Sequence, residues 1–208
     1  MNTDFDINLV LDELRKRNKI FRNEDDLKQK LRDVILDLYN NARVETEYRS
    51  PFDVRKSIDI VVIRDNEYYP IELKYKKLAF KGIVDNIEYN LSTDNAQNEN
   101  CYSALKDVER IEKFRDNEPL FKKGYTIFLT NDLSYLNVPR ENAEYKEFSI
   151  HENAVKTGTL NWNRETPKKG YEEPITLKGS YTMNWKEFSK INDEKAGTFM
   201  YLVNEIDK

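Results

Sequence analysis

The sequence has very little cysteine and histidine, and this scarcity excludes several kinds of site. Of 208 residues, one is a cysteine, Cys101, and one is a histidine, His151. A lone thiol can form neither an internal disulfide nor a zinc cluster. A single histidine argues against histidine-dependent nucleases and against a Ser–His–Asp triad.

The sequence also lacks membrane, export and nucleotide-loop segments. No window reaches the ~18 uninterrupted apolar residues of a membrane span, and the acidic start MNTDFDINLV is unlike a signal segment, which is basic and then apolar. No glycine-rich loop followed by Lys-Ser or Lys-Thr is present, so ATP binding of that kind is not expected. We therefore expect a cytoplasmic protein with no membrane partner.

Positive charge is not in excess, because the formal net charge is -4. This balance is a mild argument against a nucleic-acid partner, since lysine and arginine make the contacts to phosphate. Two basic clusters, at residues 15–22 and 74–81, run against the average. Each could contact a phosphate backbone or be an ordinary solvated surface, so the distribution keeps a nucleic-acid partner open.

What is present is a mixed series of helical and strand patterns. Apolar residues recur at helical spacing at about 4–17, 23–41 and 102–114. Runs rich in β-branched and aromatic residues predict strands at about 44–48, 57–63, 68–75, 125–130 and 199–203. The polar, Asn-rich residues 82–99 predict a loop, and residues 131–196 are less regular, with several candidate short strands. The order predicts an α/β fold with a central mixed sheet flanked by helices.

Two of the strand patterns flank Asp65-Asn66, a pair that tolerates positive φ, and so predict a β-hairpin. With the turn centred on this pair, Asp59 opposes Glu72, and Lys74 follows two residues later. Side chains alternate along a strand, so these three should share one face. The opposite face should be apolar and should hold Ile58, Ile60, Ile71 and Leu73.

Two opposed carboxylates only ~5 Å apart repel each other. A divalent cation such as Mg²⁺ would compensate, because it takes oxygen ligands. It would also lower the pKa of a bound water and neutralise charge on a scissile phosphate. Alternatively, Asp59, Glu72 and Lys74 are a solvated strand face with a Glu–Lys pair. The nearly continuous apolar runs favour a sheet covered on both sides. Burying a charge in such a sheet is costly unless the charge has a partner or a function.

These residues carry a family resemblance. Asp59 followed by Glu72-Leu-Lys74 resembles the Asp…(Asp/Glu)-x-Lys motif of the PD-(D/E)XK nuclease superfamily, which includes restriction endonucleases and many phage and repair nucleases. A preceding helix pattern with Glu24, and a following helix and strand, agree with the family order over about residues 20–135. Segments of this region also resemble a bacterial group in the superfamily associated with uncharacterised or defence-related genes. Ile58, not proline, precedes Asp59, a position at which the family varies.

The resemblance implies a restriction-endonuclease-like fold and a nuclease dependent on Mg²⁺, or on Mn²⁺. Asp59 and Glu72 would hold the metal with the Leu73 carbonyl, and Lys74 would orient the attacking water. Glu24 would complete the metal shell or would only serve the helix dipole. The expected substrate is DNA, with RNA as the alternative. The expected organisation is a single domain over 1–208, with its core at about 20–135 and 199–204 and an elaboration at about 136–198.

Other residues allow two interpretations each. Lys76 and Lys77 could contact a nucleic-acid backbone or be surface lysines, and Arg110 could lie near the phosphate or pair with Asp107 on a helix surface. Trp162 and Trp185 could stack on bases or pack in a core. The alternative function is a non-catalytic protein of the same fold that binds nucleic acid or another protein, and a homodimer or a partner protein is compatible with either function.

Overall fold

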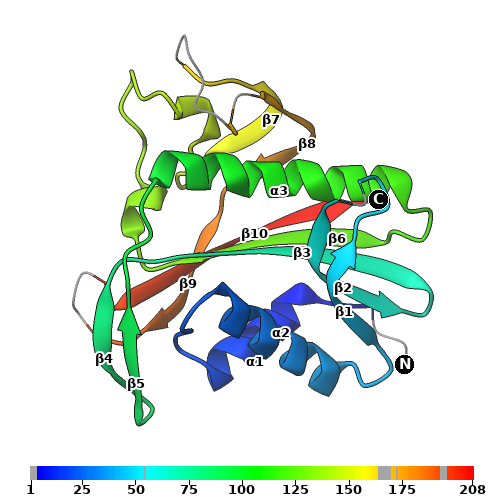
Figure 1. The fold of residues 1–208 in the computed structure, drawn as a ribbon, viewed down its shortest axis with the longest axis horizontal. Coiled ribbons are helices and arrows are strands. Elements are labelled where there is room, and N and C mark those ends of the chain that lie inside the picture. Colours follow the sequence, from blue (N-terminus) through cyan, green and yellow to red (C-terminus); the bar gives the residue numbers. More distant parts are fainter. Residues whose placement is uncertain (1–3, 54, 164–169, 172, 193–195) are drawn as a thin grey trace.

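A six-stranded sheet with helices on both faces forms the centre of the molecule (Figure 1). The computed structural model describes residues 4–53, 55–163, 170–171, 173–192 and 196–208. The strand order is β1-β2-β3-β6-β10-β9. Strands β3 and β6 are parallel and the other neighbours are antiparallel. The predicted α/β class with a central mixed sheet is therefore confirmed.

Helices α1 and α2 and strands β1, β2, β3 and β6 lie close to the bounds that the sequence predicts. The α-helices of the described chain are α1 (Ile7–Arg17), α2 (Glu24–Leu38) and α3 (Gln97–Asn117). The strands of the central sheet are β1 (Arg43–Arg49), β2 (Ser57–Arg64), β3 (Glu67–Lys76), β6 (Lys123–Thr130), β9 (Trp185–Lys190) and β10 (Thr198–Asp207). Two smaller sheets pair β4 (Phe80–Val84) with β5 (Ile87–Leu91), and β7 (Val155–Leu160) with β8 (Ile175–Thr182). Short 3-10 helices span Leu133–Leu136 and Lys146–Phe148.

Helices α1 and α2 cover one face of the sheet (Figure 1). The Asn23 side chain caps α2 by accepting a hydrogen bond from the Asp26 N–H at 2.8 Å. Leu27, Leu31 and Ile35 of α2 are buried against the sheet, and each contributes about 1.5–3 kcal/mol by burial. This packing fixes the start of α2, where Glu24 lies, relative to the strands.

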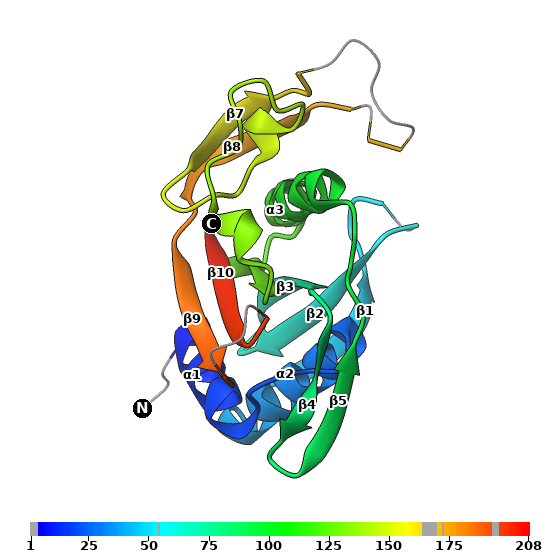
Figure 2. The ribbon, with the colours of Figure 1, turned by 90° about the vertical axis from the view of Figure 1, so that its left-hand side faces the viewer.

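Helix α3 covers the opposite face, and the β7–β8 sheet packs on the far side of α3 (Figure 2). The apolar face of α3 includes Leu105, Val108 and Ile111, all buried. Trp162 and Trp185 are buried in the same cluster, which favours core packing over base stacking for both. The second face of the sheet is therefore covered by two layers.

The predicted hairpin is present, with its turn at Asp65-Asn66. Both turn residues have positive φ, 52° and 64°, which matches the twist of a two-residue hairpin. The register is the predicted one, with Ile60 opposite Ile71. The hairpin and its register are therefore confirmed from Ile60–Ile71 to Arg64–Glu67, but the predicted pairing of Asp59 with Glu72 lies beyond the end of this ladder.

One detail of the predicted apolar face is wrong. Ile60 packs with the α1–α2 side of the sheet, whereas Ile58 packs with the α3 side. The strand alternation is broken beside Glu47 of β1, whose φ of 51° is unusual for a strand. By the β1–β2 register, this irregularity lies opposite Asp59.

The prediction of a loop over residues 82–99 is also wrong. Strands β4 and β5 form a second hairpin there, and Asp85-Asn86 makes its turn with φ values of 50° and 65°. Only Phe80, Val84 and Leu91 of its strands are buried, so the apolar signal is weak. Helix α3 then begins at Gln97, earlier than predicted.

The region predicted as an elaboration contributes to more than one layer. Strand β9 joins the central sheet beside β10, whereas β7 and β8 form their separate pair. No helix in the described ranges is both long and apolar enough to cross a membrane.

Candidate functional site

The candidate site forms where β2 and β3 separate. Their pairs run from Arg64–Glu67 to Ile60–Ile71. Beyond Ile71, three alternate N–H groups on this edge of β3 donate to carboxylates instead of strand carbonyls. The donor–acceptor pairs are Leu73–Asp59, Tyr75–Glu24 and Lys77–Asp94, with N–O distances of 2.8, 2.8 and 3.1 Å. The structure thus brings Asp59 and Glu24 to the same side of β3, whereas the sequence predicted Asp59 on the face of Glu72 and Lys74.

The Leu73 carbonyl belongs to the same edge. In a strand, the N–H and C=O of one residue point to the same side, which is why antiparallel residues exchange both bonds. The Leu73 N–H bonds to Asp59, so the Leu73 carbonyl also points into the fork, which is the gap between β2 and β3 beyond Ile71. This position agrees with the role that the resemblance implies for that oxygen.

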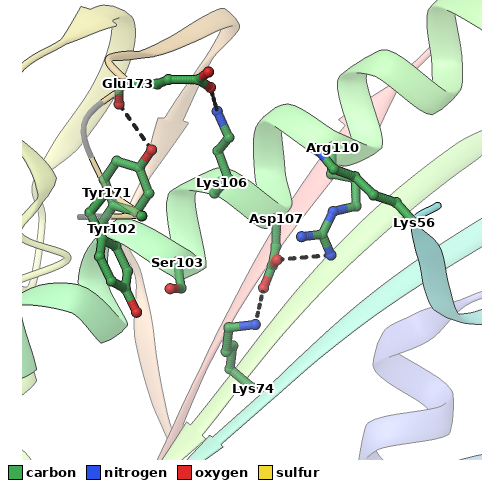
Figure 3. Close-up of a pocket in the computed structure, with 10 residues that line it drawn as sticks. Lys56, Lys74, Tyr102, Ser103, Lys106, Asp107, Arg110, Tyr171 and Glu173 are labelled. Atoms are coloured by element: carbon green, nitrogen blue, oxygen red, sulfur yellow. Dashed lines mark hydrogen bonds and ion pairs between the residues drawn. The ribbon is translucent and has the colours of Figure 1, made fainter. Parts of the chain in front are cut away.

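Glu72 and Lys74 point to the α3 face, where they meet charges of opposite sign. The Arg110 guanidinium donates to Glu72 Oε1 at 2.8 Å and lies 3.3 Å from Asp107 Oδ1. Lys74 Nζ lies 2.7 Å from Asp107 Oδ2 (Figure 3). Asp107 therefore lies between two cations on the underside of α3.

Asp59 is held from the other side of the sheet. Lys28 of α2 places its Nζ 2.9 Å from Asp59 Oδ1 and also binds Glu47. The Asp59 carboxylate thus lies in the fork, between the helix layers, and not fully on the face of Glu72 and Lys74. The site combines three acids with three cations drawn from α2, α3 and the two strands.

Burial changes the ionisation of the acids beneath α3. It raises the pKa of Glu72 well above that of an ordinary glutamate, and repulsion from Asp107 adds to the rise while Arg110 opposes it. Burial also raises the pKa of Asp107, although Lys74 and Arg110 reduce this rise. Glu72 and Asp107 therefore hold protons more readily than exposed acids.

For Asp59 and Lys74, neighbouring charges and hydrogen bonds outweigh the effect of burial on the pKa. Burial alone would raise the pKa of Asp59, but the Leu73 N–H and Lys28 outweigh it, so the pKa lies below the usual value. Burial favours the neutral amine of Lys74, but the adjacent Asp107 outweighs it and raises the pKa. Asp59 is therefore ionised and Lys74 protonated near neutral pH.

The oxygen donors of the site suit a hard divalent cation. Asp59, Glu72 and the Leu73 carbonyl are the kinds of ligand that Mg²⁺ takes, and such sites use one or two carboxylates. In the part of the chain that the structure describes, no three His, Cys, Asp or Glu side chains stand close enough to hold a metal. Two carboxylates and a carbonyl fit Mg²⁺ if Arg110 or Lys28 gives up one contact.

The predicted nucleic-acid contacts differ in their surroundings. Lys77 Nζ is bound to Asp94 at 2.8 Å and its side chain is mostly buried, which makes it a poor phosphate contact. Lys76 is half-buried and, by strand alternation, continues the row of Glu72 and Lys74. Arg110 lies inside the site, where it binds Glu72.

The sequence did not predict a role for Lys28, and the predicted surface position of Asp107 is wrong. Asp107 does pair with Arg110, but at 2% exposure it lies in the interior and not on a helix surface. Lys28 was not singled out, although it follows Leu27 on the apolar face of α2 and is 7% exposed. A lysine within an apolar helical stripe was the signal that could have found it.

A pocket of about 640 Å³ adjoins the site. It lies under α3 and beside the chain that enters β8 (Figure 3). Its wall includes Lys56, Lys74, Lys106, Arg110, Tyr102 and Tyr171. Since Lys74 and Arg110 belong to both, the pocket opens directly onto the charged cluster.

Glu72→Gln should make the metal-free chain more stable at neutral pH. The folded-state pKa of Glu72 is raised. The stability that protonated Glu72 gives the fold is therefore fully present below the unfolded pKa and is lost as pH rises through the folded pKa. A permanently neutral amide removes this loss. In EDTA, the variant should exceed the wild type by about 1–2 kcal/mol above the folded pKa. Below about pH 4, the variant and the wild type should have the same free energy of unfolding.

Urea unfolding at a series of pH values measures this effect. Glu88→Gln on β5 is a matched control, because Glu88 is exposed and its change should fall within about 0.5 kcal/mol. A Glu72→Gln chain that is less stable than the wild type at every pH would show that Glu72 is ionised and that Arg110 holds it favourably.

Comparisons of the chain with models of known families, with curated proteins and with solved structures give no match.

Proposed function

We propose that the chain is a Mg²⁺-dependent nuclease that hydrolyses phosphodiester bonds, in DNA first of all, on a restriction-endonuclease-like core. The observation that carries this proposal is that Asp59, Glu72 and Lys74 lie where β2 and β3 separate, with Asp59 bound to the Leu73 N–H and with Glu72 and Lys74 directed toward α3. Charged side chains are costly to bury without a function or a partner. Here they converge beside a pocket that is large enough for part of a substrate.

Asp59, Glu72 and the Leu73 carbonyl would hold the metal, with Glu24 on the same strand edge as an outer member. When bound, Mg²⁺ would make water more acidic and would offset negative charge growing on the phosphate. Glu72 would bind it as the carboxylate, so metal binding and the release of its proton are linked. Metal affinity should therefore rise with pH.

Lys74 acts as a donor and a fixed positive charge. Its raised pKa keeps it protonated, so it cannot take a proton from water at neutral pH. Asp107 fixes the ammonium at 2.7 Å, from where it can donate to the attacking water or to a phosphate oxygen. Arg110 supplies a second donor on the same face.

A second candidate function has an observation in its favour. Each carboxylate of the site already lies beside a cation: Asp59 beside Lys28, Glu72 beside Arg110 and Asp107 beside Lys74. A cluster that is neutralised within the chain can be stable with no metal. The alternative is therefore a non-catalytic protein of this fold that binds nucleic acid or another protein.

Metal dependence separates the two functions. Labelled single- and double-stranded DNA and RNA are incubated with the chain in Mg²⁺, Mn²⁺ or EDTA. A nuclease should give products with metal only, and saturating Mg²⁺ should raise its melting temperature by about 5 °C. Asp59→Asn should lose both responses. No products on any substrate, with no thermal shift, would select the binding protein.

A further inference from the structure

The pocket beside the charged cluster has the size of a small-ligand site. Its volume of about 640 Å³ lies within the ~300–1,000 Å³ of such sites. Helix α3 forms one wall, and Tyr171 and Glu173, which precede β8, form another (Figure 3). A cavity of this size can admit one nucleotide but not a base-paired duplex.

The charge of the pocket wall opposes that of the whole chain. Four cations line it against the two carboxylates Asp107 and Glu173, while the chain as a whole carries -4. Lys56 is half-exposed, and its Nζ lies 3.9 Å from Asp53. Lys106 Nζ lies 2.9 Å from Glu109 and 3.6 Å from Glu173. The wall residues thus include more cations than carboxylates, and a phosphate group could compete with Asp53 and Glu109 for Lys56 and Lys106.

Two tyrosines form an aromatic corner in the same wall. Tyr102 stacks on Trp162, with ring centroids 5.6 Å apart, and its hydroxyl donates to the Glu173 carbonyl at 2.9 Å. Tyr171 stands nearly perpendicular to Tyr102, at 75° and 5.4 Å, and is half-buried. These contacts bury Tyr102 and make it a fixed support for Tyr171, whose more exposed ring can stack on the face of a base.

We propose that this pocket binds one unpaired nucleotide of a single-stranded nucleic acid, its base against Tyr171, which packs on Tyr102, and its phosphate against Lys56 and Lys106. A base inside a duplex offers only its edges to a protein, because its faces are stacked. An aromatic corner therefore recognises an unpaired base. The inference rests on the proposed function for one point: the next phosphate along the strand would lie at Lys74.

Binding is measured in EDTA, where cleavage cannot interfere. Fluorescence anisotropy follows a labelled single strand of DNA, the same sequence as RNA, and a duplex with both ends closed by hairpins. The single strand should bind at least tenfold more tightly than the closed duplex. Tyr171→Ala should weaken single-strand binding about fivefold or more, while Tyr171→Phe, which keeps the ring, should bind as the wild type does.

The lysines are tested by salt dependence. Lys56→Gln/Lys106→Gln should weaken single-strand binding about tenfold and lower the slope of log K against log salt by about 0.7 for each lysine. Lys122→Gln is a matched control, since Lys122 is also half-exposed and ion-paired but contacts Glu67 at the start of β3. Its affinity should stay within about twofold. Melting curves confirm that every variant is folded.

The outcomes for the pocket and for the nuclease proposal are separate. Equal affinity for the strand and the closed duplex, or affinity unchanged in Tyr171→Ala and the double lysine variant, overturns the nucleotide pocket even if the chain cleaves. Selective binding that these variants weaken supports the pocket even if no metal yields products. The relative affinities for DNA and RNA then assign the sugar of the nucleotide.

Discussion

Replacing Lys74 with methionine should reduce metal-dependent cleavage by about 100-fold or more. Lys74 is the protonated donor that Asp107 fixes at 2.7 Å, and methionine keeps its bulk without its charge. The fold should tolerate the change, because the buried Asp107 has a raised pKa and can take up a proton. Single-turnover cleavage of a labelled substrate measures the effect on the chemical step.

Lys76→Met is the matched control for this prediction. Lys76 lies two residues further along β3, on the same face of the strand, and is half-buried. Its loss should lower the rate by no more than about tenfold, through binding rather than through the chemical step. Equal losses in both variants would assign the effect to the charge of the strand face. A fully active Lys74→Met chain would remove Lys74 from the mechanism.

Replacing Glu112 with alanine should lower the free energy of unfolding by about 3–5 kcal/mol. Glu112 is 1% exposed and accepts hydrogen bonds from the N–H groups of Lys178 and Gly179 and from the Tyr181 hydroxyl, at 2.7–3.0 Å. Alanine leaves these buried donors without an acceptor. The carboxylate joins α3 to β8, so the loss should be largest in the outer layer of the molecule.

Urea unfolding measures this loss, and hydrogen exchange locates it. Tyr181→Phe removes one of the donors and should cost about 1 kcal/mol. Glu141→Ala, at a carboxylate whose side chain is 92% exposed, should change stability by less than about 0.5 kcal/mol. If Glu112→Ala unfolds within about 1 kcal/mol of the wild type, water or a shift of β8 satisfies the donors, and Glu112 is not the main connection between the layers.

The parts of the fold that the sequence predicts are those with a strong local signal. The β-branched strands flanking Asp65-Asn66 lie in the interior of the sheet, so their apolar runs and turn residues agree. The β4–β5 hairpin has the same kind of turn at Asp85-Asn86, but its mostly exposed strands need few apolar residues. Its polar composition therefore predicts a loop, although the second Asp-Asn pair is a signal for a hairpin turn.

The candidate site also has one part that the sequence predicts and another part that it does not. The hairpin register alone brings Asp59, Glu72 and Lys74 to the same end of β2 and β3, but the ladder stops at Ile60–Ile71, so the register does not give the direction in which Asp59 faces. Lys28 and Asp107 come from helices on opposite faces of the sheet. Their positions depend on how α2 and α3 pack, and no local pattern gives that.

The carboxylates beside β3 have a consequence for stability. Leu73 and Tyr75 are buried, so their N–H groups cannot turn to water where β2 no longer pairs with β3. Asp59 and Glu24 accept these hydrogen bonds and so take the place of a missing strand. A chain stripped of these two acids should contain buried donors without acceptors, and it should lose stability along with any chemistry the acids support.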